Sequence, residues 1–389
     1  MLPVAADRLD SDLLRRICEE RWSESQTLEF KVEVPAPSDR GSHEFLKDVC
    51  ALANSAGGDI LYGVEEADGV AVGFRPIREA IEPLMRRLGQ LLDARLEPRL
   101  VGLVMKEVAV EEGYALVLRV PASFNGPHRF YFNGHSKFVV RSGTHTSELT
   151  YEQLRMAFDR TTTLGERARA FRQDRLELIL AGKTWRPLRP GPTCVVHVVP
   201  LAAMSGRQSI DITALAAAYT PFMFQDWHGG SRSTNLDGLL VHPGGADQQG
   251  AMAYTQVFRI GAFEAVRHGG ALITEERVVP STVISSFIRE ALRRFLTGCN
   301  SLGIAGPAVA GAAFLGVSGY RFAIDRRWYD WQEATADREH LILPETWIES
   351  VDEPGDVDSV ARPMLDVLWQ CFGIDRCLEY DADGRWMRQ

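Results

Sequence analysis

Apolar and polar residues follow one another in two different periods along the first part of the chain. Residues 27–31 alternate polar and apolar side chains, which is the period of a half-buried strand. Residues 42–54 repeat apolar side chains at helical spacing, and this pattern predicts a helix that Ser42 caps. The glycine pair at 57–58 then ends that helix, and residues 60–64 form a short buried strand.

The same periods predict further elements up to about residue 160. A short amphipathic helix covers residues 10–20, and a longer helix follows residue 76, with Pro83 either bending it or marking its start. Another helix begins after Thr150. Further strands are predicted at residues 100–105, 114–120 and 137–141. Strands and helices mixed in this order predict an α/β or α+β domain over residues 1–160.

The rest of the chain predicts a connector and a second domain. Residues 161–190 form a polar helical connector rich in arginine, either a solvated helix or, as the minority interpretation, a nucleic-acid contact. A β-branched run at 194–199 opens a second α/β domain that covers residues 191–389. Its other elements are predicted as a helix at 214–219, strands at 236–241 and 254–259, a helix at 282–296, a hairpin at 314–323 and a helix after Pro363.

The composition and net charge of the chain limit the classes of protein to which it can belong. The chain has 389 residues, of which 45% are hydrophobic and 24% charged, as in ordinary two-domain globular proteins. A net charge of −9 counts against a protein that coats nucleic acid by bulk electrostatics, but not against one with a local basic patch. The six cysteines form no C-x-x-C pair, and no signal peptide or membrane-spanning run is recognised. We therefore expect free thiols, a cytoplasmic location and no membrane partner.

Acidic residues accompany the first two predicted strands. If these strands lie side by side, Glu29, Lys31 and the pair Glu65-Glu66 meet at one end of a sheet. Such a cluster is either a solvated charged rim or a nuclease centre in which carboxylates hold a divalent ion and the lysine faces a phosphate. Spacing alone favours the solvated rim.

Three ordered pieces of sequence carry a resemblance to a known family. They are Glu24-Ser25-x-x-Leu28-Glu29-Phe30-Lys31, then Ala53-Asn54-Ser55-x-Gly57-Gly58-x-Ile60-Leu61-x-Gly63-Val64-Glu65-Glu66-x-Asp68-Gly69, then Phe138-Val139-Val140-Arg141-Ser142-Gly143-Thr144-x-Thr146. Together they resemble the AlbA-type domain of the Schlafen family over about residues 20–160. The resemblance implies a mixed-sheet domain with a nucleic-acid-related role.

The resemblance also implies an acidic catalytic site. Schlafen ribonucleases carry two glutamates five residues apart and an aspartate at the end of the Gly-Gly strand. These positions fall on Glu24, Glu29 and Glu66, so the third carries glutamate where the family's nucleases carry aspartate. By this resemblance the three carboxylates bind Mg²⁺ or Mn²⁺, and Lys31 faces the scissile phosphate.

Polar residues near the third piece complete the predicted site. Arg141 and the hydroxyls of Ser142, Thr144 and Thr146 are candidates to hold a phosphate, and Tyr131 to stack on a base. Core packing is the alternative for the aromatic residues, and capping of carbonyl groups is the alternative for Arg141. No phosphate-binding loop, hydrolase triad or short-range metal spacing is recognised elsewhere.

The leading functional hypothesis is a Schlafen-like, divalent-metal-dependent endoribonuclease that acts on RNA, including tRNA, or on single-stranded DNA, with a role in antiphage defence. One alternative is a non-catalytic regulator or sensor that binds nucleic acid or a nucleotide; the glutamate at 66 and the acidic net charge motivate it. Another is a protein-interaction scaffold whose charged cluster is merely solvated. The second domain is expected to select the substrate, bind a protein partner or form a homo-oligomer.

Overall fold

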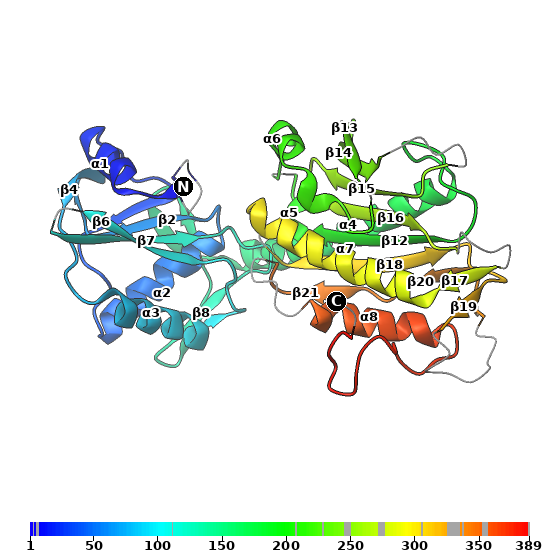
Figure 1. Cartoon of the computed structure of the whole chain (residues 1–389). Helices are drawn as coiled ribbons and strands as arrows, with labels where there is room; N and C mark the ends of the chain where they lie inside the picture. Colours follow the sequence, from blue (N-terminus) through cyan, green and yellow to red (C-terminus); the bar gives the residue numbers. More distant parts are fainter. Residues whose placement is uncertain are drawn as a thin grey trace. The chain divides into compact units, whose positions relative to one another are not determined.

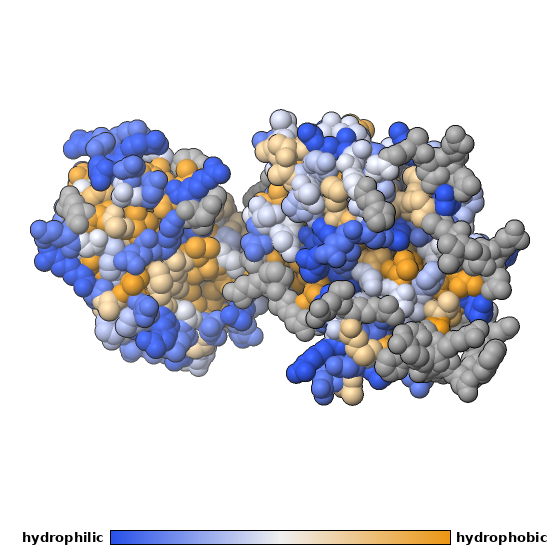
Figure 2. Space-filling view, in the orientation of Figure 1, coloured by the Kyte–Doolittle hydropathy of each residue, from blue (hydrophilic) through white to orange (hydrophobic). Residues whose placement is uncertain are grey.

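The computed structural model describes residues 1–2, 4, 8–110, 112–206, 208–227, 229–244, 250–270, 277–304, 306–324, 335–336, 338–351 and 357–387. The chain divides into two compact units, Met1–Thr163 and Leu164–Gln389 (Figure 1). Each unit combines helices with strands, so the predicted α+β class is confirmed. On the visible face of each unit, hydrophilic residues surround smaller apolar patches (Figure 2). No described helix is both long and apolar enough to cross a bilayer.

Among its described residues, the first unit contains short strands and three helices of its own, and helix α4 continues from it into the second unit. In chain order the elements are α1 (Ser11–Glu19), β1 (Leu28–Lys31), α2 (Asp39–Ala53), β2 (Gly58–Tyr62), β3 (Val64–Ala67), β4 (Val70–Phe74), α3 (Ile81–Arg95), β5 (Leu96–Glu97), β6 (Val104–Val110), β7 (Gly113–Val120), β8 (Arg129–Phe132), β9 (His135–Lys137), β10 (Val139–Ser142), β11 (His145–Glu148) and the start of α4 (Tyr151–Leu180).

A four-stranded sheet in the order β1-β2-β7-β6 forms the centre of this unit. β1 and β2 are parallel, with Glu29 opposite Ile60, and the other pairs are antiparallel. All five residues of β2 are buried because both faces of the sheet are covered. Ile60 and Tyr62 pack with α2 and α3, whereas Leu61 packs with α1. The prediction that the first two strands lie side by side is confirmed.

The helix that precedes β2 starts earlier than its sequence pattern indicates. α2 begins at Asp39 rather than after Ser42, because Ser38 Oγ accepts a hydrogen bond from the backbone N–H of Gly41 and caps the helix. Gly41 does not break the helix. A Cβ at this position would lie 2.5 Å from the carbonyl oxygen of Ala36, so glycine permits a close approach of the loop.

Other boundaries in the first unit also differ from expectation. β2 ends before Gly63, and β3 with β4 forms a separate two-stranded ribbon that the sequence pattern did not predict. α3 starts at Ile81 and has Pro83 in its first turn, where the missing N–H is not needed. The strand expected at residues 100–105 runs instead from Val104 to Val110. Glu111 lies outside the described residues.

The second unit is built on a larger antiparallel sheet. Its elements after α4 are β12 (Thr193–Pro200), α5 (Leu201–Met204), α6 (Ile212–Ala217), η2 (Thr220–Phe222), β13 (Gly230–Thr234), β14 (Gly238–Pro243), β15 (Ala253–Phe258), β16 (Phe263–His268), β17 (Val278–Pro280), α7 (Ser281–Ser301), β18 (Ala308–Leu315), β19 (Arg321–Ala323), β20 (His340–Ile342), β21 (Thr346–Ile348) and α8 (Asp358–Gln370). The strand order is β13-β14-β15-β16-β12-β18-β20, and β21 also pairs with β18.

Helices cover both faces of this sheet. On one face, Phe263 of β16 stacks on Phe295 of α7 at 5.2 Å between ring centroids. On the other face, Leu176 and Ile179 of α4 pack with Val195 of β12. The alternation of side chains along β12 and β16 therefore supplies two apolar layers, and the predicted buried strand at 194–199 is confirmed.

Two predictions for the second unit are wrong. Residues 314–323 do not form a hairpin: β18 ends at Leu315, and β19 pairs in parallel with β17. Their apolar character was sufficient to predict strands, but not to choose the partner strand. The last helix, α8, begins at Asp358 and contains Pro363 instead of following it.

The arginine-rich stretch that was predicted as a connector belongs to helix α4 as far as Leu180, and its last ten residues follow the helix. The buried Arg172 forms an ion pair with Glu345, and Arg175 donates two hydrogen bonds of 2.9 Å to the buried carboxylate of Glu264. The guanidinium groups of both arginines are directed to partners within the second unit. They attach the helix to its sheet and are not displayed as a basic surface.

Candidate functional site

Glu29 is a buried carboxylate that two cations neutralise. It lies on β1, and only 7% of the residue is exposed. Lys31 Nζ lies 2.5 Å from its Oε1, and the Arg141 guanidinium donates to its Oε2. A buried carboxylate with a single partner is costly, so the two cations together offset the cost of burying the Glu29 side chain.

Arg141 connects the β10 strand to β1. Besides Glu29, its guanidinium donates to the carbonyl oxygen of Ser25 at 3.1 and 3.3 Å. Its backbone N–H donates to Ser55 Oγ at 2.8 Å, and that hydroxyl lies 2.6 Å from the carbonyl oxygen of Ala51. Only 3% of Arg141 is exposed. The structure therefore places Arg141 in a packing role, and its guanidinium does not face solvent where a phosphate would bind.

Asp48 of α2 is a member of the cluster that the sequence analysis missed. Its Oδ2 lies 3.5 Å from Lys31 Nζ, and its Oδ1 lies 3.8 Å from Lys47 Nζ. Burial and the nearby Glu29 charge raise the pKa of Asp48 to about 6, against the opposing effect of both lysines. Asp48 follows Phe45 by three residues and precedes Leu52 by four, so helical periodicity could have identified it on the buried face.

Two neighbouring carboxylates, those of Glu29 and Asp48, stabilise the positive charge of Lys31. Burial lowers the pKa of Lys31, but the Asp48 and Glu29 carboxylates outweigh that effect and raise the pKa above its ordinary value. Its side chain is 37% exposed, whereas the two acids are almost completely buried. Lys31 is therefore the member of this cluster that reaches solvent.

Glu24 and Glu66 both contact the backbone, Glu24 at β1 and at the turn between β3 and β4, and Glu66 at that turn. Glu24 Oε1 accepts a hydrogen bond from the backbone N–H of Phe30 at 2.9 Å. Glu66 Oε2 accepts one from the N–H of Gly69 at 2.7 Å, and the carbonyl oxygen of Gly69 accepts one from the N–H of Glu24 at 2.7 Å. The Glu66 carboxylate thus stabilises the turn between β3 and β4, whereas the Glu24 carboxylate bonds to the backbone of β1.

These contacts test whether the predicted carboxylates fit a divalent ion. Both oxygens of Glu29 face cations, while Glu24 and Glu66 each have one oxygen bonded to a backbone N–H. Among the described residues, no group of three or more His, Cys, Asp or Glu side chains has an arrangement that could hold a metal. The donor set as arranged does not fit Mg²⁺ or Mn²⁺, and a metal at this site stays a prediction of the resemblance.

The predicted phosphate-binding hydroxyls lie on the hairpin of β10 and β11. Ser142 and Thr144 are exposed and Thr146 is half-buried. Within the described part of the chain these three hydroxyls make no hydrogen bond. They are therefore available to an external acceptor or donor, in contrast to Arg141.

The aromatic residues on β8 divide between its two faces. Tyr131 is 47% exposed, and the guanidinium carbon of Arg95 lies 5.9 Å from its ring centroid. Phe130 is 1% exposed and belongs to the core with α2. Tyr131 is thus open to solvent as a stacking residue requires, whereas Phe130 follows the core-packing alternative.

Histidine and amide side chains elsewhere in the chain have structural partners. His128 is buried between the carbonyl oxygen of Pro98 at 2.7 Å and Ser123 Oγ at 2.6 Å, and burial lowers its pKa. Asn54 donates to the carbonyl oxygens of His128 and Val139 at 2.8 and 2.9 Å. In the second unit, the ring of His242 stacks on that of Trp185 at 4.5 Å; His228 lies outside the described residues.

The first unit thus belongs to a class of α+β domains with a four-stranded sheet covered on both faces. The model of the family described as Schlafen, AlbA_2 matches residues 24–150 of this chain. This match confirms the resemblance to the AlbA-type Schlafen domain over that segment of the chain.

Comparisons with individual proteins add partial likenesses. No curated protein matches the chain. The DIP2311 protein of Corynebacterium diphtheriae is 17% identical, with a TM-score of 0.24, over 35% of this chain and 25% of that one. The N-terminal domain of a Nitrosomonas europaea protein described as RecG-related ATP-dependent DNA helicase is 21% identical, with a TM-score of 0.27, over 34% of this chain and 86% of that one. The match therefore spans a quarter of the length of the Corynebacterium protein.

Proposed function

We propose that the first unit binds single-stranded RNA or DNA on the surface that α2 forms with the β8–β9 and β10–β11 hairpins. The Schlafen AlbA_2 match supports a nucleic-acid-related function. The observation that carries the proposal is the neutralisation of Glu29 by Lys31 and Arg141. A carboxylate compensated on both oxygens does not repel phosphate groups, and Lys31 remains partly exposed beside it.

The exposed groups on this surface suit a strand backbone. Ser142 and Thr144 offer hydroxyls without an internal hydrogen bond among the described residues. Lys31 and Lys47, whose side chains are 37% and 29% exposed, supply positive charge near α2. Hydroxyl and lysine contacts of this kind hold phosphates without reading a sequence, so the proposed binding is tolerant of sequence and sensitive to salt.

A gel-shift experiment with the full chain tests the proposal. Labelled tRNA, single-stranded RNA and single-stranded DNA are incubated at about 50 and about 200 mM salt, and affinity is expected to fall steeply between the two. Replacing both Ser142 and Thr144 by alanine removes the exposed hydroxyls and is expected to weaken binding about tenfold. The control is Arg15→Ala on α1, which lies on the opposite face of the sheet. Absence of binding to every strand would favour the scaffold alternative.

A second candidate function is cleavage of the bound strand, as the family resemblance implies. The observation that favours it is Asp48, because a carboxyl group whose pKa is about 6 exchanges protons near neutral pH beside Lys31. Incubation with Mg²⁺, Mn²⁺ or EDTA, alongside the double variant Glu24→Ala, Glu29→Ala, tests this. Metal-dependent cleavage that the variant loses, while urea unfolding shows the variant to be folded, would establish a nuclease and its site. Intact strands in every condition leave binding as the function.

A further inference from the structure

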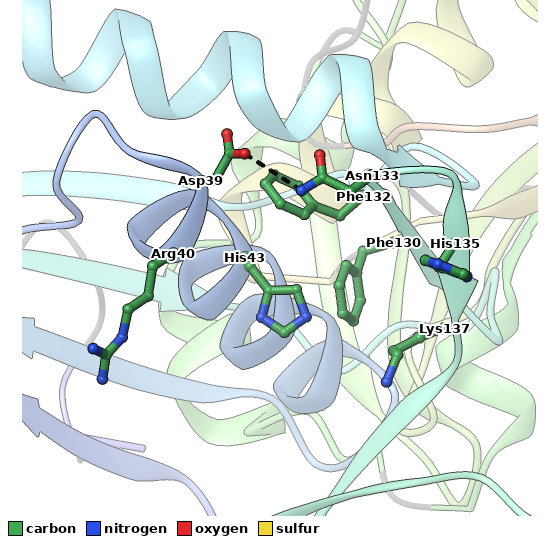
Figure 3. A pocket seen from close by; sticks show the side chains of 8 residues that line it. All are labelled: Asp39, Arg40, His43, Phe130, Phe132, Asn133, His135 and Lys137. Carbon is green, nitrogen blue, oxygen red and sulfur yellow. Dashed lines mark hydrogen bonds between the residues drawn. The ribbon is translucent and has the colours of Figure 1, made fainter.

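A pocket separate from the acidic cluster lies between the first turns of α2 and the β8–β9 hairpin (Figure 3). Its volume is about 340 Å³, which lies in the range of small-molecule sites and is too small for a duplex. Phe130 and Phe132 form an aromatic wall, and the ring of His43 meets both edge-on, at 5.3 and 5.7 Å between centroids. The wall is therefore already packed in place before any ligand enters.

Basic side chains stand at the mouth of this pocket. In Figure 3, Arg40 and Lys137 lie on either side of His43, and His135 lies beyond Phe130. Arg40 is exposed and makes no ion pair or hydrogen bond with any other described residue. Lys137 is paired with Glu148 at 2.5 Å, but both side chains are exposed, and such a pair yields readily to a phosphate.

Two further groups give the pocket a polar edge. Asn133 Nδ2 lies 3.4 Å from Asp39 Oδ2, and this long contact leaves the amide and the carboxylate with capacity for other partners. Together they present both donor and acceptor atoms beside the aromatic wall. That combination matches the edge of a nucleobase, which carries donors and acceptors in one plane.

We infer that this pocket holds one nucleotide, with its base against Phe132 and His43 and its phosphate between Arg40 and Lys137. The inference rests on the proposed function and gives it a subsite. The Lys137–Glu148 pair joins β9 to β11, so the pocket is adjacent to the hairpin that carries the exposed hydroxyls. The occupant is either a nucleotide of the bound strand, turned out of its stack, or a free nucleotide of the same chemistry.

Calorimetric titration of the full-length protein tests the inference. The probes are the four ribonucleoside 5′-monophosphates, the matching nucleosides and inorganic phosphate. At least one monophosphate is expected to bind about tenfold more tightly than its nucleoside and than phosphate. Only the complete nucleotide contacts both the aromatic wall and the basic side chains. No binding of any monophosphate at about millimolar concentration, or equal binding of phosphate alone, would overturn the inference.

Variants locate the binding. Phe132→Leu keeps the apolar volume but removes the ring, and it is expected to weaken nucleotide binding about tenfold. The double variant Arg40→Ala, Lys137→Ala is expected to remove the preference for nucleotide over nucleoside. Arg15→Ala on the other face of the sheet is the control, and melting temperatures confirm that each variant is folded. Unchanged affinity in both pocket variants would place the nucleotide elsewhere.

Gel shifts with the same variants separate this inference from the proposed function. Strand binding without nucleotide binding would refute the pocket and leave the function standing. Nucleotide binding without strand binding would refute the function and make the pocket a site for a free nucleotide. If the pocket holds a nucleotide of the bound strand, Phe132→Leu weakens the binding of both the free nucleotide and the strand. Weakening of nucleotide binding alone identifies a separate, free-nucleotide site.

Discussion

Arg141 and Glu29, 112 residues apart in the sequence, form a buried ion pair that ties β10 to β1. Both residues belong to the pieces of sequence that resemble the Schlafen family. In this structure they contact one another, while Lys31 compensates the second oxygen of the same carboxylate. At least part of the motif therefore specifies how the first unit is assembled.

Replacing Arg141 by methionine is expected to destabilise the first unit strongly. The substitution leaves Glu29 buried with Lys31 as its remaining cation, and loss of one partner of a buried pair costs about 3–5 kcal/mol. Urea unfolding should show a lower midpoint with an unchanged slope. Arg129→Met is the matched control: Arg129 pairs with Glu97 on the surface, where the cost is about 1 kcal/mol or less. Equal losses in both variants would contradict the packing role of Arg141.

Asp48 is expected to make stability depend on pH between about 4 and 6. Its folded-state pKa is raised from 3.8 to about 6, so the folded chain binds its proton more tightly than the unfolded chain. Protonated Asp48 therefore contributes about 3 kcal/mol to the free energy of unfolding. This contribution is fully present below the unfolded-state pKa and is lost as pH rises through the folded-state pKa. Urea unfolding of the wild type and of Asp48→Asn, measured at several pH values, gives this contribution as a difference.

The control for this pH dependence is Asp12→Asn, because Asp12 is 83% exposed on α1. That substitution should leave the curve of stability against pH parallel to that of the wild type. If Asp48→Asn is also parallel to the wild type between pH 4 and 6, Asp48 is not the group that is responsible.

The contacts that matter most join residues that the sequence keeps far apart. The Glu29 strand and the fold class could be predicted, because a short run of alternating residues carries that information. The ion pair between Glu29 and Arg141 could not be predicted, because periodicity gives no information about which distant segment packs against which strand. The same limit hid the pocket between α2 and the β8–β9 hairpin, where Asp39 and Asn133 are 94 residues apart. Asp48 could have been found from the helical stripe alone.

Gly311→Ala is expected to destabilise the second unit. A Cβ at Gly311 would overlap the Arg172 guanidinium, so the arginine has to shift and its ion pair with Glu345 is disturbed. Overpacking of this kind costs about 1–3 kcal/mol, and weakening the ion pair of the buried Arg172 adds to it. Thermal unfolding measures the loss.

Gly89→Ala is the control for the effect of adding a methyl group to a glycine. Gly89 lies inside α3, where an added Cβ meets no atom within 4 Å. Alanine there should stabilise the chain by about 0.5–1 kcal/mol because it favours the helix. A stabilising Gly311→Ala would show that Arg172 does not need the space over β18.

The substitution Glu29→Gln distinguishes a binding surface from a metal centre, because the two roles predict opposite changes in affinity for single-stranded RNA. The substitution removes one negative charge from beside Lys31, whose ammonium then has only Asp48 as a counter-ion in the cluster. If Lys31 contacts strand phosphates, the variant binds single-stranded RNA severalfold more tightly at about 50 mM salt, and the gain shrinks at about 200 mM. EDTA leaves the affinity of both proteins unchanged, because the carboxylates are compensated by side chains. If Glu29 instead ligates a metal that holds the strand, the variant binds more weakly and EDTA reproduces the loss in the wild type. Gel shifts of the two proteins with and without EDTA therefore decide between the two roles of Glu29, provided that urea unfolding shows both to be folded.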